Sequence, residues 1–202
     1  CSGTDGFVTT WYDQSGNGVD AAQASAANQP KIVSSGSTIL ENGKAAVEFD
    51  GNDYIPNGVG TSTPANVSAF AVRGMSTFPS VYRTLFNYKV FGLTYNSIGA
   101  TYGNGAHIFK TSTNSFKSDN YPTTTGQAID AIINKTNLER NAFVATLEAG
   151  PHYGLGTSAI GSWGNTSQTF LGTIQELIIY ESDESTNKSG IQTNINDFYS
   201  IY

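Results

Sequence analysis

Short apolar and β-branched runs recur along the whole chain and are separated by turns rich in Gly and Asn. The runs that are long enough for strands are 7–12, 31–33, 45–49, 67–72, 84–88, 91–95, 106–109, 128–133, 143–147 and 170–180. Gly and Asn between such runs supply the positive φ angles of tight turns. This spacing predicts an all-β domain built as a two-sheet antiparallel β-sandwich.

The side-chain pattern differs between these runs. In 67–72 and 143–147 odd and even positions alternate, which predicts strands with one face in the core and the other in water. The run 174–180 is apolar at most positions. It therefore predicts a central strand that is covered on both faces.

The end of the chain has a different periodicity. Apolar residues fall on one stripe of a helix at Ile191, Ile195, Phe198 and Tyr202. Ser182 and Asp183 precede this stripe as candidate N-caps, and Gly190 weakens the first turn by about 1 kcal/mol relative to Ala. Since no repeat or linker divides the chain, we expect one domain over 1–202 with a short C-terminal amphipathic helix.

Composition and charge narrow the functional classes. Charged residues make up only 13% of the 202 residues, and the formal net charge is −6. The few Lys and Arg residues are scattered, which argues against nucleic acid as a partner. No apolar run approaches the roughly 20 residues that cross a bilayer, so no membrane insertion is expected. The abundance of Ser, Thr, Asn and Gly suits a surface outside the cell.

Cys1 has no partner within the sequence because it is the only cysteine. It is either a free thiol or half of a disulfide with another chain or segment. A chain boundary that happens to fall beside an inert cysteine explains its position equally well.

Two blocks together resemble a known family. They are the segment Val8–Gly18, which contains Trp-Tyr-Asp-Gln-Ser-Gly-Asn-Gly, and the strand Gly172–Tyr180 with the trailing Asn194–Tyr199. They resemble a laminin-G-like jelly roll of the concanavalin A-like lectin and glucanase superfamily, and Ala46–Gly51 fits the same pattern. The resemblance implies a secreted or virion-surface protein that is longer at its N-terminal side or completed by another segment.

The stretch 1–16 also resembles part of the catalytic domain of family 54 arabinofuranosidases, which share this fold. That resemblance would imply a retaining glycosidase acting on arabinan-like polysaccharide. The chain departs from it, because Gly6 stands where those enzymes place a second cysteine and their Cys-Cys-Phe-Asp-Tyr-Gly segment has no counterpart. Catalytic residues are therefore not transferred. Glu48 and Asp50 would share a strand face as a carboxylate pair, but surface strands carry such pairs routinely.

Carbohydrate binding is the function that the residue chemistry supports best. Sugars are held by aromatic rings against their C–H faces and by amide or carboxylate groups at their hydroxyls. The candidate ligand-binding residues in turn-like sequence are Trp163, Tyr153, Tyr102, Tyr121 and Asn165. Each ring could equally cover an end of the core. Trp11 is expected in the core instead, on a strand face shared with Thr9 and Phe7.

Metal binding is left open by the sequence. His107 and His152 have no zinc-site spacing. Two groups carry oxygen ligands at intervals that suit a structural calcium ion: Asp13, Asn17 and Asp20, and Asp50, Asn52 and Asp53. Turn chemistry explains both groups equally well. No other cofactor is expected.

Three hypotheses about function follow. The first is a non-catalytic carbohydrate-binding or adhesion module of a secreted or virion-surface protein, with a glycan or cell-surface polysaccharide as its partner. The second is a structural domain of a phage fibre, capsid decoration or extracellular filament, with protein neighbours as partners. The third is a glycoside hydrolase.

Overall fold

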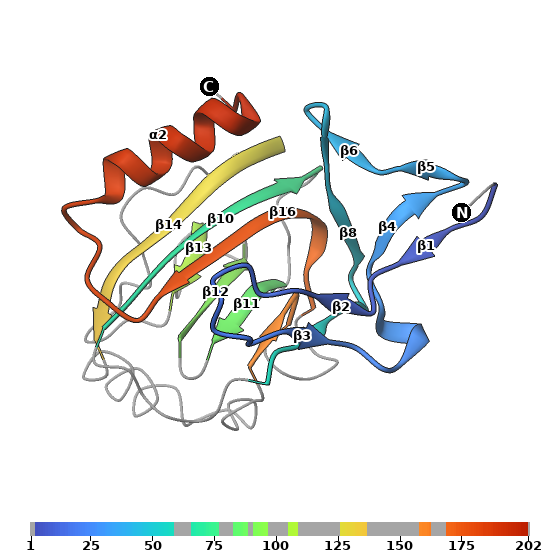
Figure 1. Ribbon diagram of the computed structural model, residues 1–202, viewed down its shortest axis with the longest axis horizontal. Helices are drawn as coiled ribbons and strands as arrows, with labels where there is room; N and C mark the ends of the chain where they lie inside the picture. Colours follow the sequence, from blue (N-terminus) through green and yellow to red (C-terminus); the bar gives the residue numbers. More distant parts are fainter. Residues whose placement is uncertain are drawn as a thin grey trace.

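The computed structural model describes residues 3–58, 66–76, 83–88, 91–96, 105–108, 126–136, 158–162 and 169–201. This part of the chain is mostly strand, with antiparallel sheets and a C-terminal helix (Figure 1). The strands of the larger sheet are β1 (Gly6–Phe7), β4 (Lys31–Ser34), β5 (Ser37–Thr38), β8 (Val47–Asp50), β10 (Asn66–Met75), β14 (Gly126–Thr136) and β16 (Leu171–Tyr180). Their order is β1-β4-β8-β16-β10-β14, with β5 paired to β4.

A second sheet has five strands in the order β13-β12-β11-β15-β9. They are β9 (Ile55–Pro56), β11 (Arg83–Tyr88), β12 (Phe91–Asn96), β13 (Gly105–Ile108) and β15 (Ala159–Ile160). Two small hairpins are separate from both sheets: β2 (Thr10–Trp11) with β3 (Ala21–Ala22), and β6 (Leu40–Glu41) with β7 (Lys44–Ala45). A 3-10 turn, η1 (Ala26–Asn28), follows β3.

The main buried cluster draws side chains from both sheets. Phe49 and Ile174 come from the seven-stranded sheet, whereas Ile55 and Phe86 come from the five-stranded one. Phe49 meets Phe170 edge to face, with ring centroids 6.2 Å apart. Burial of such aromatic and branched side chains is the main favourable term in the stability of the fold.

The strand β16 confirms the prediction of a central strand covered on both faces. It lies between β8 and β10. Leu177 and Ile179 pack against the main cluster, whereas Ile178 and Tyr180 pack against a second cluster under the helix. The buried residues of this second cluster are Phe70, Val72, Ile129, Ala131, Ile195 and Tyr199. Alternate side chains of a strand point to opposite faces, so an apolar run fits a strand between two apolar layers.

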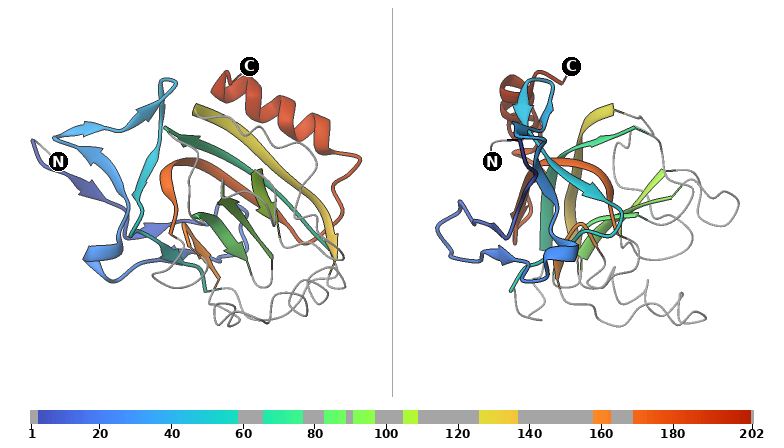
Figure 2. Two further views of the ribbon diagram at one scale, coloured as in Figure 1. Left: turned by 180° about the vertical axis from the view of Figure 1, so that it is seen from behind. Right: turned by 90° about the vertical axis from the view of Figure 1, so that its right-hand side faces the viewer.

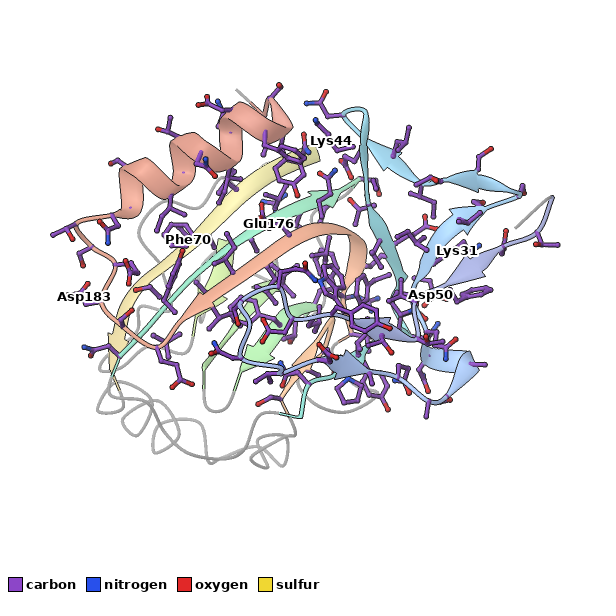
Figure 3. The ribbon with its side chains drawn as sticks, viewed as in Figure 1. Lys31, Lys44, Asp50, Phe70, Glu176 and Asp183 are labelled. Carbon is purple, nitrogen blue, oxygen red and sulfur yellow. The ribbon has the colours of Figure 1, made fainter. Side chains whose placement is uncertain are left out.

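The prediction that 67–72 has one wet face is wrong, because β10 is buried on both faces from Val67 to Met75. Ala69 and Ala71 face the main cluster. Phe70 and Val72 contact the cluster under the helix, where Figure 3 shows Phe70 between sheet and helix. The helix covers the face that alternation alone assigns to water.

The helix α2 (Lys188–Tyr199) confirms the predicted C-terminal helix but not its details. Ile195 and Tyr199 are its buried residues, whereas Phe198 is 58% exposed, so Tyr199 takes the buried place predicted for Phe198. Tyr202, the last residue of the predicted stripe, lies outside the described residues. The predicted N-cap is also wrong, because Asn187 is the N-cap residue. Ser182 and Asp183 lie in the preceding turn, where Asp183 Oδ1 accepts the Ser185 N–H at 2.9 Å.

The β6–β7 hairpin fixes the C-terminal end of α2. Asn42 Nδ2 donates to the carbonyl oxygens of Tyr199 and Ser200, at 2.6 and 2.8 Å. These are among the carbonyls that a helix leaves without partners at its C-terminus. Lys44 Nζ lies 4.1 Å from the ring centroid of Phe198, at the same end of the helix (Figure 3).

Candidate functional site

The five residues predicted to bind a ligand, Trp163, Tyr153, Tyr102, Tyr121 and Asn165, lie outside the described residues, as does the predicted strand 143–147. They stay predictions. The site is therefore built from the described residues that expose an aromatic ring beside polar side chains. The hairpin formed by β2 and β3 is such a place.

The β2–β3 hairpin holds residues 12–20 as an exposed loop. Thr10 pairs with Ala22, and Trp11 pairs with Ala21. Ala21 is buried in the main cluster and also bridges Asn57, so the base of the hairpin is tied to the core. Figure 2 shows the hairpin projecting from the body on the side of the seven-stranded sheet that also carries α2.

Asp13 locks the conformation of this loop. Its Oδ1 accepts the Ser15 N–H at 2.8 Å, and its Oδ2 accepts the Val19 N–H at 3.0 Å. The Asp13 N–H in turn donates to Asp20 Oδ1 at 2.8 Å. Bonds from the Ser15 hydroxyl and from the Val19 and Ser15 N–H groups hold the pKa of Asp13 below its usual value. The ionised carboxylate thus ties both ends of the loop together.

Two glycines complete the turn inside the loop. Gly16 has φ of +85° and Gly18 has φ of +71°, which L side chains rarely adopt. The segment 12–20 is thus a closed loop with a defined shape. A loop held in one conformation loses less entropy when it binds a ligand.

The side chains on this loop form a small amphipathic surface. Tyr12 is 65% exposed and Val19 is 40% exposed. Gln14 and Asn17 are exposed amides beside them in the sequence. An exposed ring with neighbouring amides can stack on an apolar face of a ligand and bond its hydroxyl groups.

Trp11 packs against the main cluster as a partly buried residue, which agrees with its predicted place. Phe7 does not share that place, because it is 49% exposed at the sheet edge, with Lys31 Nζ 5.9 Å from its ring centroid. The sequence interpretation missed Tyr12 as a candidate ligand-binding residue. The available signal was alternation: an inward Trp11 places the next side chain outward.

The two suggested calcium loops use their carboxylates for turn bonds. In the second loop, Asp50 Oδ1 accepts the Asn52 N–H at 2.7 Å and Asp53 Oδ2 accepts the Asp50 N–H at 2.9 Å. Within the described ranges, no three His, Cys, Asp or Glu side chains gather as metal ligands do. Asx-turn chemistry accounts for the bonds that both loops make.

The 50–53 turn contains a carboxyl group with an unusual environment. Asp53 is only 7% exposed. Burial raises its pKa to about 6, and the charge of Asp50 and a side-chain bond with Asp50 act in the same direction. Arg83 Nη1 stabilises the turn from the other sheet by donating to the Thr169 carbonyl oxygen at 3.0 Å and to the Gly51 carbonyl oxygen at 3.4 Å.

Glu48 and Asp50 share the exposed face of β8, as predicted. On the same sheet, Lys31 on β4 forms an ion pair with Asp5 at 2.9 Å (Figure 3 labels Lys31 and Asp50). Asp50 is bonded into the following turn. Glu48 and Asp50 therefore place their charges on the solvent-exposed side of β8.

None of the helices in the described part is long and apolar enough to span a membrane. Comparison with protein-family models, with curated proteins and with solved structures found no match in any of the three. The geometry of the chain itself is thus the basis for its functional assignment.

Proposed function

We propose that the chain is a non-catalytic carbohydrate-binding module and that the β2–β3 loop contacts the saccharide. The observation that carries the proposal is Tyr12, which is 65% exposed on a loop that Asp13 holds closed. An aromatic ring fixed in water beside exposed amides fits the C–H faces and hydroxyl groups of sugars. Partners of this kind are a glycan or a cell-surface polysaccharide.

The same proposal extends to the fold and to where the protein acts. The two antiparallel sheets would form a jelly-roll β-sandwich of the laminin-G-like, concanavalin A-like kind. The buried cluster shared by Phe49 and Ile174 with Ile55 and Phe86 supports this arrangement. The low content of charged residues supports a place on a secreted protein or on a virion surface.

Replacing Tyr12 by Ala is expected to lower the affinity for the bound saccharide at least about tenfold, because one stacked ring contributes on the order of 1.4 kcal/mol. Tyr12→Phe keeps the ring and is expected to stay within about threefold of wild type. Binding is measured on a glycan array and then by calorimetry with the glycans that bind. Tyr12 is exposed, so both variants should unfold at the wild-type urea concentration.

Trp163→Ala is the matched comparison, since Trp163 is the foremost ring among the residues predicted from the sequence. Loss of binding in Trp163→Ala with full binding in Tyr12→Ala would place the saccharide away from the β2–β3 loop. If the wild-type protein binds no glycan on the array and no cell surface, carbohydrate binding is contradicted altogether. An assembly role with protein neighbours would then be the better assignment.

A further inference from the structure

The charge around the β2–β3 loop is negative. Residues 12–20 contain Asp13 and Asp20 and neither Lys nor Arg. Asp20 is exposed, and the bonds that Asp13 accepts from the Ser15 and Val19 N–H groups favour its charged form. An acceptor-rich loop of this kind offers amides to a ligand but no cation.

Three of the described cations on other elements are engaged where they lie. Lys31 pairs with Asp5 at 2.9 Å, and Lys44 lies over the ring of Phe198. Arg83 donates to the Thr169 carbonyl oxygen. Recognition of a carboxylate, sulfate or phosphate normally uses Arg or Lys in direct contact, and the loop does not supply one.

We propose that the β2–β3 loop selects uncharged saccharides and rejects those that carry carboxylate or sulfate groups. This inference rests on the proposed function and adds the class of ligand to it. Tyr12 would stack on the sugar ring while Gln14 and Asn17 bond its hydroxyls. An acidic substituent beside Asp20 would meet a like charge, and residues 12–20 supply no counter-ion, which disfavours binding at low ionic strength.

The test compares matched neutral and acidic forms of the same glycans on one array. The probes are N-acetyllactosamine with and without sialic acid or sulfate, and fully methyl-esterified polygalacturonate against polygalacturonate. Wild-type protein should bind the neutral member of each recognised pair at least about fivefold more tightly at low salt. In about 1 M salt, where charges are screened within roughly 3 Å, the ratio should fall toward one.

Two variants test whether the charge on the β2–β3 loop causes this preference for neutral glycans. Asp20→Asn removes one charge but keeps an oxygen that can accept the Asp13 N–H. It should lower the neutral-to-acidic ratio at least about twofold at low salt. Asp197→Asn removes the same charge from an exposed position on α2, and it should leave the ratio at the wild-type value.

The outcomes separate the inference from the function on which it depends. Binding that requires Tyr12 but favours the acidic glycans would overturn the inference and leave carbohydrate binding intact. A neutral-to-acidic affinity ratio that is the same in Asp20→Asn as in wild type would also overturn the inference. If no glycan on the array binds at all, both the inference and the proposed function fail.

Discussion

Replacing Gly172 by Ala is expected to lower the free energy of unfolding by about 3 kcal/mol or more. Gly172 pairs with Phe49 of β8 and lies beside Gly74 of β10, at the centre of the larger sheet. A Cβ atom there would collide with the Gly74 carbonyl oxygen and press on the Phe170 ring at 3.2 Å. The φ angle of +147° adds strain that L side chains avoid.

Urea denaturation measures this loss directly. Gly190→Ala is the matched control, because a Cβ at Gly190 in the first turn of α2 has no neighbour within 4 Å. That variant should be as stable as wild type or gain up to about 1 kcal/mol from helix propensity. A Gly172→Ala protein with wild-type stability would contradict the described packing of β16 against β10.

Asp53→Asn is expected to stabilise the protein at pH 7 and to flatten its pH dependence. The pKa of Asp53 is raised from an ordinary value of 3.8 to about 6 in the folded state, because burial disfavours the charged form. Between these values the folded state binds more protons than the unfolded state. Stability from this group is therefore greatest below the unfolded pKa and falls as pH rises through the folded pKa, by up to about 3 kcal/mol.

Unfolding in urea at a series of pH values from about 4 to about 7 tests this sign. The amide oxygen of the new side chain could still accept the Asp50 N–H, so Asp53→Asn should match wild type at the acid end and exceed it at neutral pH. Asp183→Asn is the control of opposite sign, since bonds from the Ser185 hydroxyl and N–H lower the pKa of Asp183. Parallel pH profiles for wild type and Asp53→Asn would contradict the buried environment of Asp53.

The parts of the fold that the sequence predicted are those where local pattern and environment agree. The apolar run of β16 required cover on both faces, and the main cluster and the helix provide it. The strands β11 and β12 and the helix α2 likewise follow from β-branched or periodic runs. In each of these elements the apolar positions follow the spacing of one kind of secondary structure, either strand or helix.

The errors arose where tertiary contacts override a local pattern. The run 7–12 is two short strands, β1 and β2, in different sheets. The helix packs along β14, and its Ile195 and Tyr199 share a buried cluster with Phe70 and Val72, which are buried although alternation assigns their face to water. Tyr199 replaces Phe198 on the buried side of α2, where its hydroxyl donates to the Gln175 carbonyl oxygen at 3.3 Å. Such long-range contacts leave no periodic signal.

Of the candidate site, the sequence predicted the place of Trp11 but not the role of Tyr12. The size and strand context of Trp11 predict a core residue, and it packs against the main cluster. The role of Tyr12 depends on the bonds from Ser15 and Val19 to Asp13, which close the loop. The sequence shows those residues as a turn but does not show which ring the closed turn exposes.

Backbone amide NMR tests most directly whether a saccharide contacts the β2–β3 loop. The isotope-labelled protein is titrated with a glycan that binds on the array. We expect the largest shift changes at the amides of residues 12–20 in the wild-type protein, and no such changes in Tyr12→Ala. Shift changes centred on Trp163 or Tyr153, with 12–20 unmoved, would contradict saccharide contact at the β2–β3 loop.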